Sequence, residues 1–581
     1  MPLETPARIV NELAQRGYNA DREAVTVLAN ADDPARAIER ALDAAPDDAI
    51  KLSADHVESA LAESEPSEPS TAATTAGDSA TETTGSDHGG SGNPAGSGAT
   101  TAATTETDPS ASSGTDPTTS TESGDAVPPE TEGSADAAAA TDAPGGSGVA
   151  TDATGGTDRR TTTEPVATGE RSIDTDLHDV EIEGDMTGQS TGTGEYSDFV
   201  AVFRDRYERL SRQLRGRINH RPTNTLSSMA GGSEAAIVGM VSDIRSTASG
   251  HWLIELEDTN GVYPCLVMKD RDTAEQVEEL LHDEVIAVEG TLSDDNSDGD
   301  GILFVDDLYF PEIPRTHQPS TADREVSAAL VSDVHVGSQE FMADAWSRFA
   351  DWLHTEEADA VEYLLIAGDM VEGVGVYPDQ DEELDIVDIY DQYRAFSEFL
   401  KEVPGDMEIV MIPGNHDAVR LAEPQPGFDE ELRDIMSAHD CRITSNPSTV
   451  TVEGVSVLMY HGVSLDEVIA ELPDEKANYD EPHKAMYQLL KKRHVAPQFG
   501  GHTRLAPEER DYLVIEETPD VFHAGHVHKF GYGKYHNVLT INSGCWQEQT
   551  AFQESVNIDP DTAMAPIVDL DTLDLTIRKF A

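Results

Sequence analysis

The sequence predicts a multidomain protein of mixed α/β (α+β) class. Its 581 residues exceed what one hydrophobic core usually serves, so at least two folded units are expected. Residues 234–312 consist of short apolar runs separated by turn signals, which predicts a compact all-β domain. From about residue 325 apolar strands alternate with helical stretches, a pattern typical of α/β layering.

Two regions precede the β-rich part. Residues 1–62 alternate helical patterns with Asp and Pro breaks, and Ser53 is a suitable N-cap, so we expect a small helical docking domain. Residues 63–195 consist mostly of Ser, Thr, Gly, Ala, Pro, Asp and Glu. Such a segment cannot bury enough apolar surface to offset its chain entropy, which predicts a disordered acidic linker.

An Arg-rich amphipathic helix is expected over residues 196–222. Phe199, Phe203 and Tyr207 recur at helical spacing, and arginines occupy the other faces. One interpretation is a helix that packs on the next domain. The other is a contact with a partner or with nucleic acid.

Residues 223–315 are predicted to form a small closed barrel. Alternating apolar runs are separated by turn dipeptides such as Asn260-Gly261. The number and size of the strands favour an OB-type barrel. A plain β-sandwich without a ligand is the alternative.

The composition restricts the possible functions less than it first suggests. With 112 Asp and Glu against 38 Lys and Arg, the formal net charge is −74, which ordinarily disfavours nucleic acid as a partner. The same composition is typical of proteins adapted to molar salt, where charges are screened within a few Å, so DNA is not excluded. Three cysteines without CxxC spacing indicate neither disulfides nor a zinc ribbon. No signal peptide or membrane span is evident, so we expect a soluble, cytoplasmic protein without a membrane partner.

Within residues 316–581, polar side chains follow five apolar runs that read as strands. Active sites of α/β sheets lie at the carboxyl ends of strands, which makes these side chains candidates for one site. The candidates are Asp333, His335, Asp369, Asn415, His416, His461, His526 and His528.

The residue types at these strand ends indicate a metal centre. Carboxylate, imidazole and amide ligands together suit Mn, Fe or Zn better than Mg or Ca. In the patterns Asp-x-His and His-x-His, both side chains point to the same side of an extended strand. One carboxylate can bridge two ions about 3.5–4 Å apart. A single such motif would more often be a turn or a structural histidine, but five in order favour two metal ions.

The motifs SDVHVG, GDMVEG, GNHD, YHG and GHVH resemble the five motifs of calcineurin-like metallophosphoesterases. Longer stretches such as PGNHDAVRLAEPQP and INSGCWQEQTAFQ resemble the small subunits of archaeal D-family DNA polymerases, here from a halophilic archaeon. The resemblance covers residues 199–581. It implies an OB-type barrel followed by a two-layered β-sandwich flanked by helices of the metallophosphoesterase type.

The resemblance also implies a role for each site residue. The first ion would be held by Asp333, His335 and His528, with Asp369 bridging, and the second by Asn415, His461 and His526. His416 would be the general acid, with Asp417 orienting it. Glu372 stands where the wider superfamily commonly has Asp and is expected outside the ligand set.

The function implied is that of a proofreading 3′–5′ exonuclease, the small subunit of a heterodimeric replicative DNA polymerase. Two divalent ions are expected as cofactors, Mn²⁺ first, with Fe or Zn as alternatives. Expected partners are the large catalytic subunit, DNA with single-stranded or frayed 3′ ends, and the sliding clamp. Candidate DNA contacts are Arg212, Arg215, Lys491, Lys492 and Arg493, although the last three also fit a solvated helix end.

Two other functions fit parts of the sequence. A catalytically silent scaffold would resemble the eukaryotic polymerase B-subunits, which lose metal ligands that this chain keeps. A metallophosphatase would be expected to carry GDxVDRG and GNHE, whereas GDMVEG lacks the arginine and GNHD lacks the glutamate.

Overall fold

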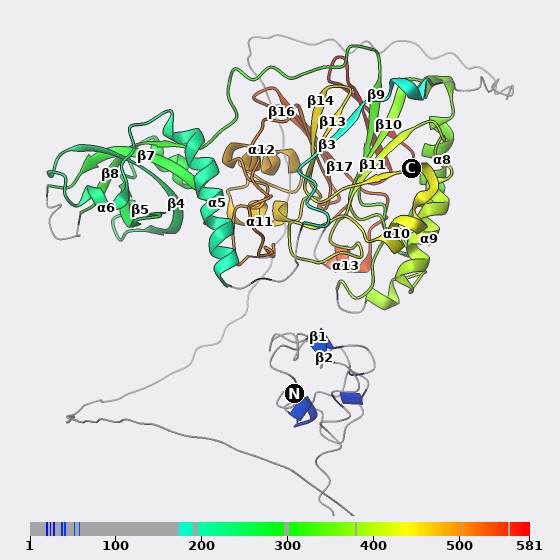
Figure 1. Cartoon of the computed structure of the whole chain (residues 1–581), viewed down its shortest axis with the longest axis horizontal. Helices are drawn as coiled ribbons and strands as arrows, with labels where there is room; N and C mark the ends of the chain where they lie inside the picture. The colour runs from blue at the N-terminus through cyan, green and yellow to red at the C-terminus, as the bar shows by residue number, and fades with distance from the viewer. Residues whose placement is uncertain are drawn as a thin grey trace, which may run out of the picture. The chain divides into compact units, whose positions relative to one another are not determined.

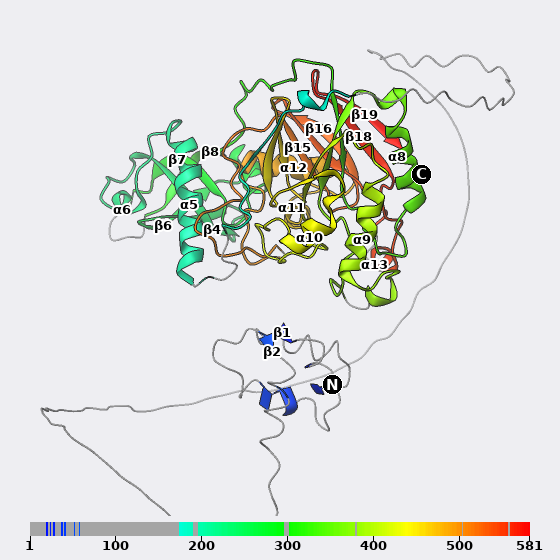
Figure 2. The same cartoon turned by 45° about the vertical axis from the view of Figure 1, so that its right-hand side comes forward.

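A computed structural model describes residues 173–189, 194, 196–294, 301–377, 380–501, 503–555 and 558–581, with short pieces between 19 and 57 (Figures 1 and 2). The chain divides into two compact units, Met1–Glu164 and Pro165–Ala581. Among the described residues, no helix is both long and apolar enough to cross a membrane.

Little of the first unit is described. Strands β1 (Asn19–Ala20) and β2 (Lys51–Leu52) pair in parallel, which the sequence did not predict. Leu28 and Ile38 are helical and buried. Most of the helical domain predicted for residues 1–62, and the linker over residues 63–172, lie outside the described residues.

The second unit begins inside the predicted linker, which is a correction. Residues 180–183 form β3 (Val180–Glu183), an edge strand antiparallel to β13. Val180 and Ile182 pack against the core between the two large sheets, and Met186 is fully buried. The four-residue alternation of apolar and acidic residues was too short to stand out in a polar segment. The linker therefore cannot extend to residue 195.

Helix α5 (Tyr196–Arg215) ends seven residues before the predicted limit of 222. Gly216 follows its last residue, and glycine is a poor helix former. The apolar side of α5, with Tyr207, Leu210 and Leu214, packs on the outer surface of strands β4 and β7. The buried side of α5 therefore confirms the interpretation that this helix packs on the next domain.

A closed barrel follows, as the sequence predicted. Its strand order is β4-β5-β6-β8-β7, and β6 and β8 pair in parallel to close it. The Asn260-Gly261 dipeptide lies in the hairpin between β5 and β6. The elements are α6 (Thr223–Leu226), β4 (Glu234–Ser246), β5 (Trp252–Asp258), β6 (Gly261–Val267), α7 (Thr273–Val277), β7 (Val285–Leu292) and β8 (Leu303–Tyr309).

Two six-stranded sheets form the rest of the unit. The first has the order β12-β11-β10-β9-β18-β19, with β9 to β12 parallel. Its strands are β9 (Ser327–Val331), β10 (Val361–Ala367), β11 (Glu408–Ile412), β12 (Arg442–Ile443), β18 (Met564–Asp569) and β19 (Asp574–Lys579).

The second sheet has the order β16-β17-β15-β14-β13-β3, and its β14, β15 and β17 are parallel. Its further strands are β13 (Ser448–Val452), β14 (Val455–Met459), β15 (Val521–Ala524), β16 (Phe530–Tyr535) and β17 (Val538–Ser543).

The sheets pack face to face and helices cover both outer faces. Leu365 of β10 and Ile541 of β17 belong to the same buried core. Figure 1 shows α8 and α9 beside one sheet and α11 and α12 beside the other. The helices and 3₁₀ turns are η1 (Thr175–Leu177), α8 (Ala343–Leu353), η2 (Glu356–Ala358), η3 (Gln380–Glu382), α9 (Ile389–Leu400), α10 (Glu430–Ile435), η4 (Ser437–His439), α11 (Ser464–Glu471), α12 (Pro482–Lys492) and α13 (Ala551–Ser555).

Candidate metal centre

The structure brings all seven predicted ligands to one place. Each follows the carboxyl end of a strand that runs parallel to its neighbour: β9, β10 and β11 in the first sheet, and β14 and β15 in the second. The carboxyl ends of parallel strands meet at one edge of a sheet, and the two sheets pack with these edges together. The predicted ligands are Asp333, His335, Asp369, Asn415, His461, His526 and His528.

The backbone at these strand ends is strained. Left-handed φ values are uncommon outside glycine and cluster at functional sites. Five of the predicted ligands have them: Asp333 (53°), His335 (56°), Asp369 (51°), His526 (73°) and His528 (54°). Glycine precedes several ligands because the chains approach closely; a Cβ at Gly414 would collide with Asp369 Oδ1, and one at Gly525 with Asp333 Oδ2.

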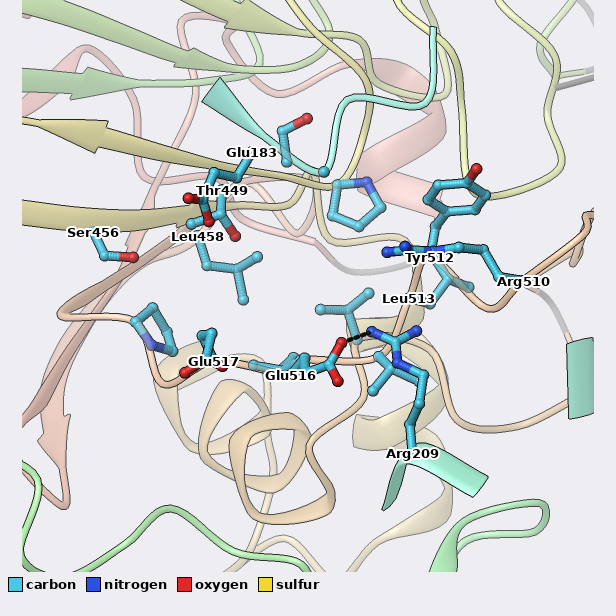
Figure 3. Close-up of a pocket in the computed structure, with 17 residues that line it drawn as sticks. Glu183, Arg209, Thr449, Ser456, Leu458, Arg510, Tyr512, Leu513, Glu516 and Glu517 are labelled. Atoms are coloured by element: carbon cyan, nitrogen blue, oxygen red, sulfur yellow. Dashed lines mark hydrogen bonds and ion pairs between the residues drawn. The ribbon is translucent and has the colours of Figure 1, made fainter. Parts of the chain in front are cut away.

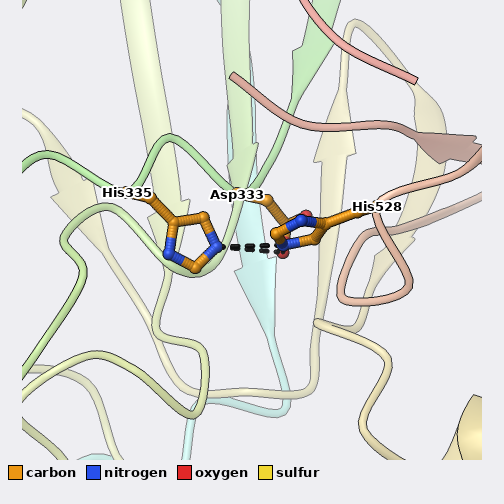
Figure 4. A group of neighbouring side chains, drawn as sticks. All are labelled: Asp333, His335 and His528. Atoms are coloured by element: carbon orange, nitrogen blue, oxygen red, sulfur yellow. Dashed lines mark hydrogen bonds and ion pairs between the residues drawn. The ribbon is translucent and has the colours of Figure 1, made fainter. Parts of the chain in front are cut away.

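The first cluster consists of Asp333, His335 and His528 (Figure 4). The Nε2 atoms of the two histidines are 3.0 Å apart. Asp333 Oδ1 lies 3.4 Å from His528 Nε2 and 3.9 Å from His335 Nε2. Three ligand atoms thus face a common point, as imidazole and carboxylate groups do around a cation.

The second cluster consists of Asp369, Asn415 and His461. His461 Nδ1 donates to the carbonyl of Ala367 at 2.9 Å, which makes Nε2 of the neutral ring an acceptor. That Nε2 lies 2.9 Å from Asn415 Oδ1 and 3.2 Å from Asp369 Oδ2. Three acceptors this close require either a second proton on His461 or a cation among them.

Asp369, in the second cluster, also lies close to the first. Its Oδ2, which faces His461, is also 3.9 Å from His335 Nε2. Burial alone would raise the pKa of Asp369, but the charges of His461 and His416 bring it well below its ordinary value. Burial alone would lower the pKa of His461, but Asp369 raises it to about 10. A metal ion would replace that proton, so metal binding should release protons.

His526 completes the group from the other side. One of its ligand atoms lies within 4.8 Å of those of Asp369 and His461. Its Nε2 is 3.1 Å from Oδ2 of Asp466, on the first turn of α11. Sequence reasoning missed Asp466, because no strand-end motif contains it.

Glu372 was expected outside the ligand set, and the structure gives it a direct role in the site. Its Oε2 lies 2.8 Å from His335 Nδ1, which favours the proton on Nδ1 and leaves Nε2 to face the cluster. Its carbonyl accepts a hydrogen bond from His416 Nδ1 at 2.7 Å. Burial would raise the pKa of Glu372, but His335 and His416 lower it to about 2.

Asn415 and His416 are neighbours in the bend that follows β11 (Glu408–Ile412), and their side chains have different partners. Asn415 faces His461, whereas the His416 ring lies 4.8 Å from the His335 ring. Asp417 does not orient His416 as expected. It accepts from the backbone of Gly414 at 2.9 Å and from the Tyr393 hydroxyl at 2.9 Å, so it fixes the loop itself.

The donor set fits divalent cations. Among the described residues, the charges that most lower the pKa of Asp333 and of Asp369 are those of histidines, and none belongs to Lys or Arg. In metal sites, a histidine typically binds the ion through one ring nitrogen and donates the N–H of the other to a carbonyl or a carboxylate. A cavity of about 140 Å³ opens on the group, lined among others by His335, Asp369 and His416.

A second cavity, of about 240 Å³, lies elsewhere on the unit (Figure 3). It is lined by β3, by neighbouring strands and by Arg209, which pairs with Glu516 at 2.9 Å. None of the predicted ligands lines it.

Two of the predicted DNA contacts are buried. Lys492 is 0% exposed and Arg493 is 3% exposed. Lys492 Nζ donates to the carbonyl of Glu279 at 2.6 Å and lies 3.2 Å from Glu284 Oε2, in the barrel domain. Burial contradicts a DNA contact for both residues. They instead join α12 to neighbouring segments, because a buried cation needs nearby acceptors.

The other three differ in position. Lys491 pairs with Glu279 Oε2 at 2.6 Å and covers the Phe310 ring, so it also belongs to the barrel interface. Arg212 and Arg215 are exposed on α5. For these two, DNA contact stays a prediction.

The family model for the B subunits of DNA polymerases alpha and epsilon matches residues 328–532. A solved structure titled as a novel archaeal phosphodiesterase covers 44% of this chain and 99% of its own, with 14% identity and a TM-score of 0.23, too low to carry an argument.

Two relatives are far more similar in sequence. The DNA polymerase II small subunit of Halobacterium salinarum is 62% identical over 581 residues, 100% of this chain and 100% of the relative. That of Archaeoglobus fulgidus is 42% identical over 384 residues, 65% of this chain and 76% of the relative. The chain therefore belongs to the small subunits of the archaeal D-family DNA polymerase, called DNA polymerase II in these relatives, and it is a member from a halophile.

Proposed function

We propose that this chain is the 3′–5′ exonuclease subunit of its polymerase and hydrolyses DNA phosphodiester bonds from the 3′ end. Its family makes it a subunit of a DNA-directed DNA polymerase with a role in replication. The large catalytic subunit is the implied partner in a heterodimer. DNA and the sliding clamp are proposed as further partners.

We also propose a fold type for the barrel and for the two-sheet domain. In the barrel, β4 pairs with both β5 and β7, and β6 and β8 close it in parallel, which supports an OB-type barrel. The two packed sheets with helices outside, and a site at their strand ends, support a metallophosphoesterase-type domain. An OB-type barrel beside a hydrolytic site suits single-stranded DNA.

The observation that carries the proposal is the convergence of acceptor atoms at two adjacent points. Asp333, His335 and His528 would hold one ion, and Asn415, His461 and His526 the other, with Asp369 between them. Two divalent ions, Mn²⁺ first with Fe or Zn as alternatives, would supply positive charge to the phosphate oxygens.

His416 would act on the leaving group. Its Nδ1–H is held by the Glu372 carbonyl, so Nε2 is the nitrogen available for proton transfer, and the side chain lines the cavity. When water attacks phosphorus, the bond to the 3′ oxygen of the penultimate nucleotide breaks. His416 would donate a proton to that oxygen.

One observation favours a second function. The family model that matches describes the B subunits of polymerases alpha and epsilon, which suggests a silent scaffold. The full ligand set counts against it, because buried carboxylates and imidazoles facing one another cost stability unless a ligand uses them. A metallophosphatase has no comparable support here.

The test uses the full chain with single-stranded DNA, with the label on the phosphate of the last linkage, in Mn²⁺ at molar KCl. We expect the 3′-terminal nucleotide to be released as labelled mononucleotide, and this release should be abolished by a chelator and restored by Mn²⁺. Metal analysis should find two ions per chain. Two bound ions without nucleotide release, alone or with the large subunit, would favour the scaffold.

A further inference from the structure

Aromatic side chains surround the mouth of the metal-site cavity. Tyr377, Tyr479 and Phe552 line it together with His335, Asp369 and His416. Phe552 is 44% exposed and Tyr479 is 40% exposed. A single exposed aromatic side chain is ordinary on a protein surface. Three aromatic side chains lining one cavity are less ordinary.

Tyr377 and Phe552 form a stacked pair. Their ring centroids are 4.9 Å apart and their planes differ by 22°. The Tyr377 hydroxyl lies 3.0 Å from both Glu372 Oε1 and Glu383 Oε2 and can donate its one hydrogen to either, which holds the ring in place. Its centroid is 6.2 Å from that of the His416 ring, which places the pair directly beside the site.

Packing within α13 does not explain why Phe552 lies at the cavity. This five-residue helix has Gln553 as its buried residue, and Gln553 points into the site, where it contacts His528 Nδ1 at 2.9 Å. Phe552 therefore extends from a segment anchored at the metal centre. Its ring packs on Tyr377 and remains open to solvent over much of its surface.

The charges around the cavity restrict the ligand. Among the described residues that line it, none is Lys or Arg. With a net charge of −74, the chain has little positive charge to attract a phosphate backbone. In molar salt such attraction is also screened within a few Å and released counterions contribute little. Stacking of a base on an aromatic ring requires neither positive charge nor counterion release, and it is possible for every base.

We propose that the Tyr377–Phe552 pair is a stacking platform for the 3′-terminal nucleobase of single-stranded DNA. The base stacks on the exposed part of Phe552, and its phosphodiester then lies over the metal centre. The platform supplies affinity without sequence preference. The proposal rests on the proposed hydrolytic function for its substrate, but binding can be measured without hydrolysis.

The test is Phe552→Ala in the full chain at molar KCl. The binding probe is an oligonucleotide with 2-aminopurine at its 3′ end and a phosphorothioate as the last linkage, which slows cleavage. Stacking should quench the 2-aminopurine in the wild type. In Phe552→Ala the quench should be lost and the Kd raised about 5- to 150-fold. Phe552→Trp should keep both near wild type.

Hydrolysis gives a second measurement. Phe552→Ala should raise KM for a normal 3′ nucleotide by a similar factor and leave kcat unchanged. A substrate with an abasic 3′ residue has no base to stack, so the variant and the wild type should cleave it equally. Tyr532→Ala is the control, since Tyr532 is 49% exposed on β16 and does not line the cavity.

The outcomes separate the two proposals. If the wild type quenches the probe but releases no nucleotide, the platform stands and the hydrolytic function fails. If Phe552→Ala affects normal and abasic substrates equally, or leaves the quench intact, the platform is wrong whatever the activity.

Discussion

Two regions of the second unit bury several charged side chains, and they differ in how those charges are balanced. At the interface of α5 with its neighbours, each buried charge meets an opposite charge or a carbonyl: Arg206 lies 2.7 Å from Asp511, which also lies 3.0 Å from His494. At the candidate metal centre, Oδ2 of Asp369 and Oδ1 of Asn415 both face Nε2 of His461, so acceptors face acceptors. Balanced charges indicate a structural contact. Unbalanced ones indicate a place where a cation binds.

The largest expected effect is that of Asp369→Asn. Without the carboxylate between the two clusters, we expect nuclease activity to fall below detection and metal content to fall below two ions per chain. The free energy of unfolding without metal should fall by less than the about 3–5 kcal/mol typical of a broken buried ion pair, because His461 can lose its second ring proton and leave no unpaired charge. Activity, metal analysis and thermal unfolding in chelator check this.

Two outcomes would contradict the prediction for Asp369→Asn. Normal activity of Asp369→Asn would remove the two-ion assignment. A large loss of metal-free stability would mean that Asp369 and His461 act as an ordinary buried ion pair. The contrast between the two regions would then disappear.

The second prediction concerns His416→Ala. Loss of a positioned acid should lower kcat about 10²- to 10⁴-fold while both ions stay bound. Asn415→Ala should instead weaken metal retention, with partial rescue by excess Mn²⁺. A substrate with a 3′-sulfur leaving group needs little protonation, so it should restore much of the His416→Ala loss and none of the Asn415→Ala loss. Loss of a metal ion from His416→Ala would place this residue among the ligands.

The sequence predicted that these polar side chains would lie together, because each follows a strand directly and parallel strands bring their carboxyl ends to one edge. It could not predict contacts between distant segments. The run Lys491 to Arg493 reads as a solvated helix end, since its partners Glu279 and Glu284 lie in the barrel domain. The role of Glu372 was missed because the motif shows its position but not that it contacts His335.

The third prediction tests the balanced region with Asp511→Asn. Arg206 is fully buried, so losing its carboxylate partner leaves an unpaired charge that should cost about 3–5 kcal/mol of the free energy of unfolding. Metal content should not change. Burial alone would raise the pKa of Asp511, but Arg206 and His494 lower it strongly.

The pH dependence of this effect follows from the lowered pKa. The ionised carboxylate stabilises the fold fully above about pH 4, its ordinary pKa, and this contribution is lost as the pH falls. The difference in unfolding free energy between the wild type and Asp511→Asn should therefore shrink below that pH. A difference that stays constant would mean that Asp511 acts through shape rather than charge.

The smallest expected effect is on α5 itself, where buried and exposed arginines lie on one helix. Arg212 and Arg215 are exposed, and replacing both with Ala should change the free energy of unfolding by less than about 0.5 kcal/mol. If they contact DNA phosphates, the double variant should bind single-stranded DNA more weakly at low salt, with a flatter dependence of the Kd on salt. At molar KCl the two proteins should bind alike, because the phosphate contacts are screened. Equal affinity at every salt concentration would leave α5 as a packing helix only, with Arg206 and Arg209 as its functional arginines.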